Sequence, residues 1–205
     1  MPGVTGHDEV YAESREAWRQ WLLTNHAKRA SVWLVYYKKD SGIPSVRYSE
    51  AVEEALCFGW IDSRVQSIDE KRYRQHFTVR KPRSVWSGIN KGRVEKLRAQ
   101  GLIMPAGLRA IETAKANGSW ESLNAAEALE MPPDLIAALD SVPGARRNFD
   151  AWSQSQRQIL LQWIASAKRA ETRVRRIAET AESAGRNVRP GPLAYLQRGN
   201  DANKR

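Results

Sequence analysis

Arginine, lysine and hydroxyl side chains alternate with tryptophan in two nearby stretches of the chain, 60–64 and 77–91. Arginine forks bind phosphate or carboxylate oxygens, a hydroxyl or amide adds a hydrogen bond, and a tryptophan ring offers a planar face. A helix that starts at Ser87 or Asn90 would add free backbone N–H groups. The pattern therefore predicts a basic, tryptophan-lined groove for an anionic small ligand, with the candidate binding residues Asp62, Arg80, Lys81, Ser84, Trp86 and Asn90.

In this interpretation Arg80 and Lys81 hold the anion, and Trp86 packs against its planar or apolar part. Asp62 orients Arg80 from the side. The same residues also allow a purely structural interpretation, in which Trp60 and Trp86 anchor the core and Asp62 simply pairs with Arg80. The sequence leaves both interpretations open.

Cys57, the single cysteine, is the one candidate nucleophile. A catalytic thiol needs a base or a cation to lower its pKa, and His76 or Arg80 could supply one if the fold brought them together. A cysteine late in an apolar helix is more often a small core residue, so we expect a buried, slowly reacting thiol. No catalytic residue is assigned, and an enzyme that uses Cys57 remains an alternative.

Cofactor and metal signatures are missing from the sequence. There is no Gly-x-Gly-x-x-Gly, no P-loop, no His-Glu-x-x-His and no paired Cys-x-x-Cys, so we predict neither a cofactor nor a metal site.

Positive charge is concentrated in two blocks, although the whole chain has 33 basic and 23 acidic residues and a net charge of +10. Residues 63–100 carry 11 basic and 3 acidic groups, and residues 150–205 carry 11 and 5. Such a field attracts phosphates, nucleic acid or acidic partners. Nucleic-acid binding through both blocks is therefore the second hypothesis, and the enzyme that uses Cys57 is the third. The charge also allows a plainer interpretation, in which it only keeps the protein soluble.

The elements that must position these residues can be read from periodicity. Residues 12–27 form an amphipathic pattern with Trp18, Trp21 and Leu22 on one side, and residues 31–38 are typical of a strand. A helix ends near Gly59, and a hairpin follows. Its second strand places Tyr73, Gln75, Phe77 and Val79 on the core face and Arg72, Arg74, His76, Thr78 and Arg80 on a cationic face.

The predicted fold class is α+β, with a small mixed or antiparallel sheet packed by helices and followed by an all-helical C-terminal segment. In that segment we expect Ile159, Leu160, Trp163 and Ile164 to face inward, with Trp163 as the main anchor, and Val174, Ile177, Ala178 and Ala181 to face them. The expected divisions are a flexible N-terminus at 1–11, an α+β domain with the basic groove at 12–120, a linker at 121–133, the helical segment at 134–184 and a loosely ordered basic tail at 185–205.

No secretory signal and no apolar stretch long enough to span a membrane occur in the sequence, and a lone cysteine suits a reducing compartment. We therefore expect a cytoplasmic protein. Composition does not predict an oligomeric state.

Four segments carry a family resemblance: 55–63 (ALCFGWIDS), 75–81 (QHFTVRK), 84–90 (SVWSGIN) and 163–177 (WIASAKRAETRVRRI). Across residues 12–184 the chain resembles the YdeI/OmpD-associated family, also called bacteriocin-protection proteins. The resemblance implies a bacterial, cytoplasmic protein without an established catalytic activity, and a role in stress or antimicrobial protection. Val79 departs from the family's Phe-Thr-Pro-Arg-Lys form, and we expect it to let the strand run one or two residues further than a proline would.

Overall fold

The computed structural model describes residues 9–194, and the chain divides into two compact units, Met1–Trp120 and Glu121–Arg205. The division falls where the predicted linker 121–133 begins. That stretch is not a bare connection, because its residues Asn124–Glu127 form a short helix, α5, within the second unit.

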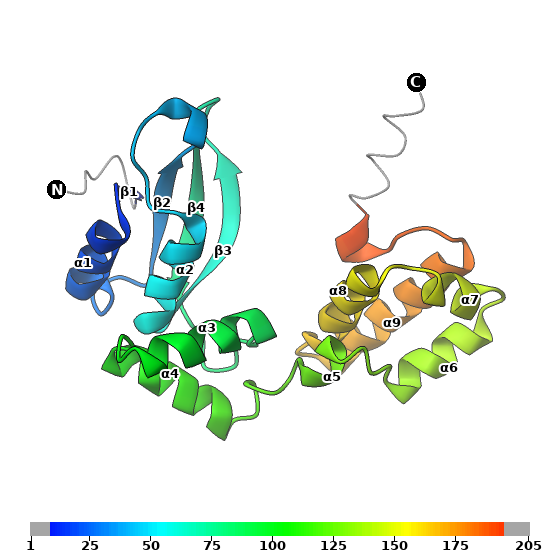
Figure 1. Ribbon diagram of the computed structural model, residues 1–205. Helices are drawn as coiled ribbons and strands as arrows, with labels where there is room; N and C mark the ends of the chain where they lie inside the picture. Colours follow the sequence, from blue (N-terminus) through cyan, green and yellow to red (C-terminus); the bar gives the residue numbers. More distant parts are fainter. Residues whose placement is uncertain (1–8, 195–205) are drawn as a thin grey trace. The chain divides into compact units, whose positions relative to one another are not determined.

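The first unit is built on a sheet in which, among the described residues, four strands lie in the order β1-β2-β4-β3 (Figure 1). β1 runs parallel to β2, whereas β2 and β3 both pair antiparallel with β4, so the predicted mixed sheet is confirmed. The strands are β1 (Glu9–Tyr11), β2 (Ser31–Tyr37), β3 (Trp60–Ser67) and β4 (Arg72–Val79), and a short 3-10 turn, η1 (Lys39–Ser41), follows β2.

The edge strand β1 lies in a segment that the sequence predicts to be flexible. Residues 9–11 pair with 33–35 of β2, and the Glu9 carboxylate forms an ion pair with Arg74 of β4. The expectation for 1–11 is therefore wrong at 9–11, because a three-residue strand shows too little periodicity to be recognised. Residues 1–8 lie outside the described part of the chain.

One face of the sheet carries the core of the first unit. Val32, Leu34 and Phe77 point into it and meet the buried side chains of the helices. Trp18, Trp21 and Leu22 are buried as predicted, and the Trp18 indole N–H donates to Ala51 O at 3.1 Å. The helices of this unit are α1 (Arg15–Asn25), α2 (Tyr48–Cys57), α3 (Gly88–Ala99) and α4 (Pro105–Ala116).

α4 packs on the C-terminal end of α2 through direct backbone contact. A Cβ atom placed on Gly107 would lie 2.3 Å from Cys57 O, and the Met104 N–H donates to the same oxygen at 2.9 Å. On the other side, a Cβ on Gly59 would lie 2.9 Å from Ala106 O. Only glycine at 107 lets the two helices approach so closely.

Gly107→Ala should lower the free energy of unfolding of the first unit by about 1–3 kcal/mol or more, because backbone atoms must move to make room. The matched control is Gly92→Ala in α3, where a Cβ would meet nothing within 4 Å. That change should stabilise the protein by about 0.5–1 kcal/mol, through helix propensity. Urea denaturation of both variants checks the pair, and equal effects at the two positions would contradict the proposed contact.

The second unit is helical, as predicted, with a core of its own around Phe149, Trp152 and Leu135. None of the described helices of the chain is both long and apolar enough to cross a membrane. The helices are α5 (Asn124–Glu127), α6 (Pro133–Ser141), α7 (Ala145–Asp150), α8 (Gln154–Ala165) and α9 (Ala170–Gly185), followed by a 3-10 turn, η2 (Gly191–Leu193).

The inward faces of α8 and α9 differ from the predicted ones. α8 buries Leu160, Leu161 and Ile164, while Ile159 is 36% exposed and Trp163 only half-buried. α9 is rotated so that Val174 is 67% exposed and its buried residues are Ile177, Thr180, Ala181, Ser183 and Ala184. The small buried Thr, Ser and Ala side chains allow close packing on α6 and α7, which periodicity of large apolar residues did not reveal.

Residues 186–194 pack on the helices rather than forming the loose tail expected for 185–205. Leu193 is fully buried, and the Gly191 N–H donates to the Glu179 carboxylate at 2.9 Å. The Arg189 guanidinium lies 4.6 Å from the ring centre of Trp152. Tyr195 and Leu196, the other apolar residues of this stretch, lie outside the described residues.

Leu193→Ala should lower the free energy of unfolding of the second unit by about 2–5 kcal/mol, the usual cost of truncating a buried leucine. Val174→Ala is the control, since an exposed position should change stability by about 0.5 kcal/mol or less. Differential scanning calorimetry would record both. A Leu193→Ala variant with an unaltered melting temperature would restore the interpretation of this segment as a loose tail.

Candidate functional site

β3 begins and β4 ends at the same end of the sheet (Figure 1). A groove of about 680 Å³ lies at this end. Its walls come from the loop 26–30 between α1 and β2, from residues 58–60 and 79–82, and from α4. The loop is joined to the sheet, because the Val79 N–H donates to Ala30 O at 3.0 Å. Val79 is the last residue of β4, and a proline at this position could not donate that hydrogen bond.

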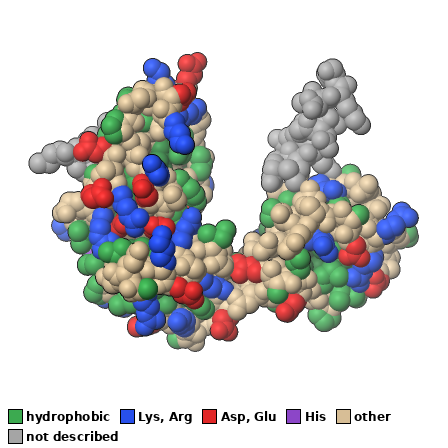
Figure 2. Space-filling model, viewed as in Figure 1, with side chains coloured by type: hydrophobic (Ala, Val, Ile, Leu, Met, Phe, Trp, Pro, Cys, Tyr) green, Lys and Arg blue, Asp and Glu red, His purple; other side chains and the backbone are tan. Residues whose placement is uncertain are grey.

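The described residues that line the groove include basic side chains and neither Asp nor Glu. The basic lining residues are Lys28, Arg29, Arg80, Lys81 and Arg109. Elsewhere on the surface the two signs of charge are mixed, as the visible face of the first unit shows in Figure 2. A groove lined by one sign of charge focuses the field and concentrates anions.

Arg80 follows β4 directly and is only 8% exposed. Its backbone N–H donates to Gly59 O at 2.9 Å, and its guanidinium carbon lies 3.6 Å from the centre of the Trp86 ring. The Nη1 atom donates to Val85 O at 3.0 Å. Strand alternation predicts Arg80 on the exposed cationic face, and this is wrong because β4 ends at Val79 and the Arg80 side chain is buried against Trp86.

The Arg80 guanidinium has hydrogen-bonding capacity to spare. No carboxylate of the described residues forms an ion pair with it, and its buried Nε finds no partner. Burial lowers the pKa of Arg80 to about 10, and the more distant Asp62 carboxylate acts weakly in the opposite direction. Burying an unpaired charge costs free energy, which an anion placed against the guanidinium would offset.

Asp62 does not orient Arg80. Its Oδ2 accepts hydrogen bonds from the Tyr48 hydroxyl at 2.9 Å and from Gln75 Nε2 at 3.0 Å, and it is not among the lining residues of the groove. Partial burial, together with this carboxylate, raises the pKa of Tyr48 to about 12. Position 62 pairs with Phe77 across the sheet, so its side chain points to the face that α2 covers.

Trp86 lines the groove, but its role differs from the predicted one. The side chain is 1% exposed, one ring face carries Arg80, and the Trp120 ring lies at 4.9 Å. It is therefore a support for Arg80 rather than a surface for a ligand. The loop it stands on is held by α4, since Asn117 Nδ2 donates to Pro82 O at 2.8 Å.

Of the remaining candidates, Lys81 lines the groove and is exposed, whereas Ser84 and Asn90 do not line it. The Ser84 N–H donates to Lys81 O in a turn. In the first turn of α3, the Asn90 side chain accepts from Arg93 Nη1 at 3.0 Å. The structure thus brings together Arg80, Lys81 and Trp86 and leaves out Asp62, Ser84 and Asn90.

Three basic lining residues were missed by sequence reasoning: Lys28, Arg29 and Arg109. They belong to segments with a net negative charge, so a block count of charge could not find them. The pair 28–29 between alanines, directly after a helix, was the one available signal.

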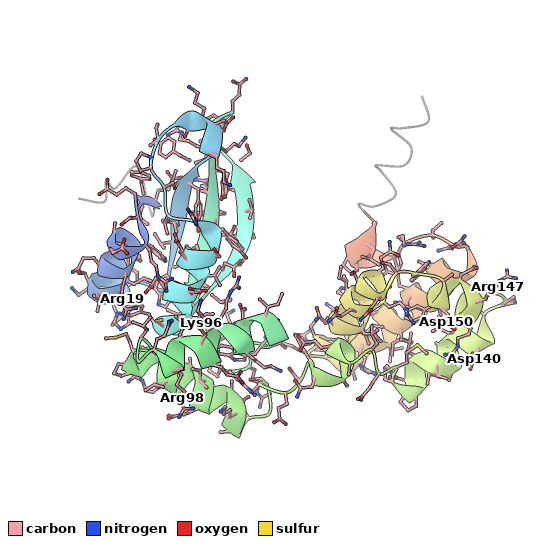
Figure 3. All side chains as sticks on the ribbon, in the orientation of Figure 1. Arg19, Lys96, Arg98, Asp140, Arg147 and Asp150 are labelled. Carbon is pink, nitrogen blue, oxygen red and sulfur yellow. The ribbon has the colours of Figure 1, made fainter. Side chains whose placement is uncertain are left out.

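Cys57 is fully buried, as predicted. Burial raises the pKa of its thiol to about 11, and the neighbouring Glu54 carboxylate acts in the same direction. Glu54 itself is 2% exposed and binds Arg15 and Arg19, the latter labelled in Figure 3, at 2.6 Å each. His76 is not brought to this thiol, because its ring contacts Trp33 on the opposite face of the sheet.

Native protein should react with a thiol reagent far more slowly than denatured protein between pH 7 and 9. Both burial and a pKa near 11 keep Cys57 protonated in this range, so raising the pH to 9 should produce little thiolate. Absorbance at the wavelength of the released chromophore follows the reaction. Rapid labelling of folded protein at pH 7 would contradict this and favour a catalytic thiol.

Metal binding finds no support among residues 9–194, where no group of three or more His, Cys, Asp or Glu side chains is placed to hold an ion.

Comparison with known proteins divides the chain as the structure does. Residues 10–110 match the model of a domain of unknown function, DUF8412, and this segment contains every basic residue of the groove. No curated protein and no solved structure was found to match the chain.

Residues 128–187 match the family model described as bacteriocin-protection, YdeI or OmpD-associated. Of the four segments behind the predicted resemblance, 163–177 lies in this match and the other three lie in 10–110. The predicted resemblance to the YdeI/OmpD-associated, bacteriocin-protection family is thus confirmed for 128–187, the part of the chain that this family model covers.

Proposed function

We propose that the first unit binds an anionic small molecule in the basic groove, with Arg80 as its anchor. The observation that carries this proposal is a guanidinium 8% exposed in the wall of the groove, without a carboxylate partner and with an unused Nε. A ligand oxygen against the guanidinium would offset the cost of burying this cation without a carboxylate partner. Lys81, Lys28 and Arg109 stand around it as exposed cations.

Binding without catalysis suits the groove better than an enzymatic reaction. Its lining holds neither Asp nor Glu, and the Cys57 thiol is buried in the core. The imidazole that lines it, His26, has its Nδ1 2.8 Å from Leu22 O and its ring packed against Phe58. A contribution to protection against bacteriocins is suggested by the name of the matched family model.

Nucleic-acid binding through both basic blocks receives less support, because cations of the second block are engaged within their own unit. Arg173 forms a two-pronged ion pair with Asp134, with N–O distances of 2.8 and 3.0 Å. Arg176 donates to Trp163 O and to the Ser166 hydroxyl. These contacts compete with phosphate binding.

Thermal denaturation with inorganic phosphate, sulfate or citrate tests the proposal. A ligand at 100 times its Kd stabilises the folded state by about 2.7 kcal/mol, so at least one of these anions should raise the melting temperature of the first unit. Arg109→Glu should abolish the rise, because it places a carboxylate in the groove wall. Arg80→Ala is a poor variant, since it opens a cavity beside Trp86.

Arg98→Glu is the matched control. Arg98 is exposed in the last turn of α3 and does not line the groove (labelled in Figure 3). The charge change is identical in the two variants. A general effect of net charge would therefore reduce the stabilisation by the anion equally in both. That outcome, or the absence of any stabilisation of the unmodified protein, would reject the groove as an anion site.

A further inference from the structure

The groove combines one buried cation with several exposed ones. Arg80 is 8% exposed, whereas Lys28, Lys81 and Arg109 are exposed on three separate elements around it. A single small anion against Arg80 would leave the other cations uncompensated. A ligand with several negative charges would also bind the three exposed cations, which we call the rim.

The phenyl and indole rings of the groove are closed to a ligand. Phe58, Trp60 and Trp86 are each 1% exposed or less, and one face of Trp86 is covered by Arg80. The half-buried His26 ring already packs against Phe58, with the ring centres 5.1 Å apart. Stacking, which is how proteins commonly hold a nucleobase, is therefore not provided. Recognition must come from charge and hydrogen bonding to oxygens.

The groove has one fixed cation and several movable ones, and this combination suits a ligand with successive phosphoryl groups. Arg80 presents a planar fork at a fixed position, and the exposed lysines act as movable point charges, as lysines do around phosphate. A terminal phosphoryl group carries more negative charge than one carboxylate at neutral pH, and each inner group of a phosphate chain adds one further charge. A phosphate chain thus matches the charge of the groove with the fewest atoms.

We propose that the groove binds a chain of two or more phosphoryl groups, with one end against Arg80 and the remainder along Lys28, Lys81 and Arg109. This inference rests on the proposed anion site and names its ligand class. The phosphate chain can be free or attached to a nucleoside. Because no ring is free for stacking, a nucleoside should add nothing to the affinity.

Isothermal titration with orthophosphate, pyrophosphate, tripolyphosphate and ATP, at two salt concentrations, tests the proposal. Tripolyphosphate should bind about tenfold or more tightly than orthophosphate. Its additional contacts with Lys28, Lys81 and Arg109 each add to the binding free energy, and a tenfold change in affinity requires only a small gain. Its affinity should also fall more steeply with salt, because more ions are displaced. ATP should bind like tripolyphosphate when both are measured without divalent cations.

Variants distinguish the contribution of the exposed cations to binding from that of Arg80. Lys28→Ala with Arg109→Ala should weaken tripolyphosphate binding much more than orthophosphate binding, and so bring the two affinities close together. Lys96→Ala with Arg98→Ala removes two charges from α3, outside the groove, and should change neither affinity. Arg80→Lys should weaken both ligands, since it keeps the charge and loses the fork over Trp86.

The outcomes distinguish the two proposals. Equal affinities for orthophosphate and tripolyphosphate would overturn the phosphate-chain inference and leave the anion site intact. Binding of none of the phosphates, together with stabilisation by citrate, would do the same in favour of a carboxylate ligand. An equal loss in the α3 control variant would show unspecific attraction and overturn both proposals, as would binding of no anion at all.

Discussion

The contact between the backbone of α4 and the end of α2 is the constraint on which the groove depends. Gly107 lies against Cys57 O, and the same oxygen accepts from the Met104 N–H. Because the two helices meet without side chains between them, Arg109 of α4 reaches the end of the sheet where Arg80 emerges. The last turn of α4 then holds the loop after β4 through Asn117 and Pro82 O.

Within that frame, the Arg80 guanidinium lies on the Trp86 ring and donates to Val85 O. Trp86 and Val85 O replace the carboxylate that normally accompanies a buried arginine, yet neither carries a full negative charge. The guanidinium is consequently fixed in position before any ligand arrives, and little side-chain entropy remains to be lost on binding. This preformed cation is the observation on which the proposed anion site rests.

Periodicity predicted the elements better than it predicted the site. The Trp18, Trp21 and Leu22 stripe, the β3–β4 hairpin and the buried Cys57 follow from local spacing alone. Alternation failed at Val79 and Arg80, because it cannot indicate where a strand stops pairing. Arg109 joins the site through a helix contact made by a glycine, and Val174 faces outward because α9 packs through small residues. Both depend on partners distant in the sequence, which no local pattern records.

The hydrogen bond from the Val79 N–H to Ala30 O acts on one part of the groove wall and not on the other. It fixes the loop that carries Lys28 and Arg29, but it contributes nothing to the seat of Arg80 on Trp86. A proline at 79 would release that loop while preserving the anchor. The chemistry of one backbone N–H at position 79 thus governs the placement of the 26–30 loop independently of the contact between Arg80 and Trp86.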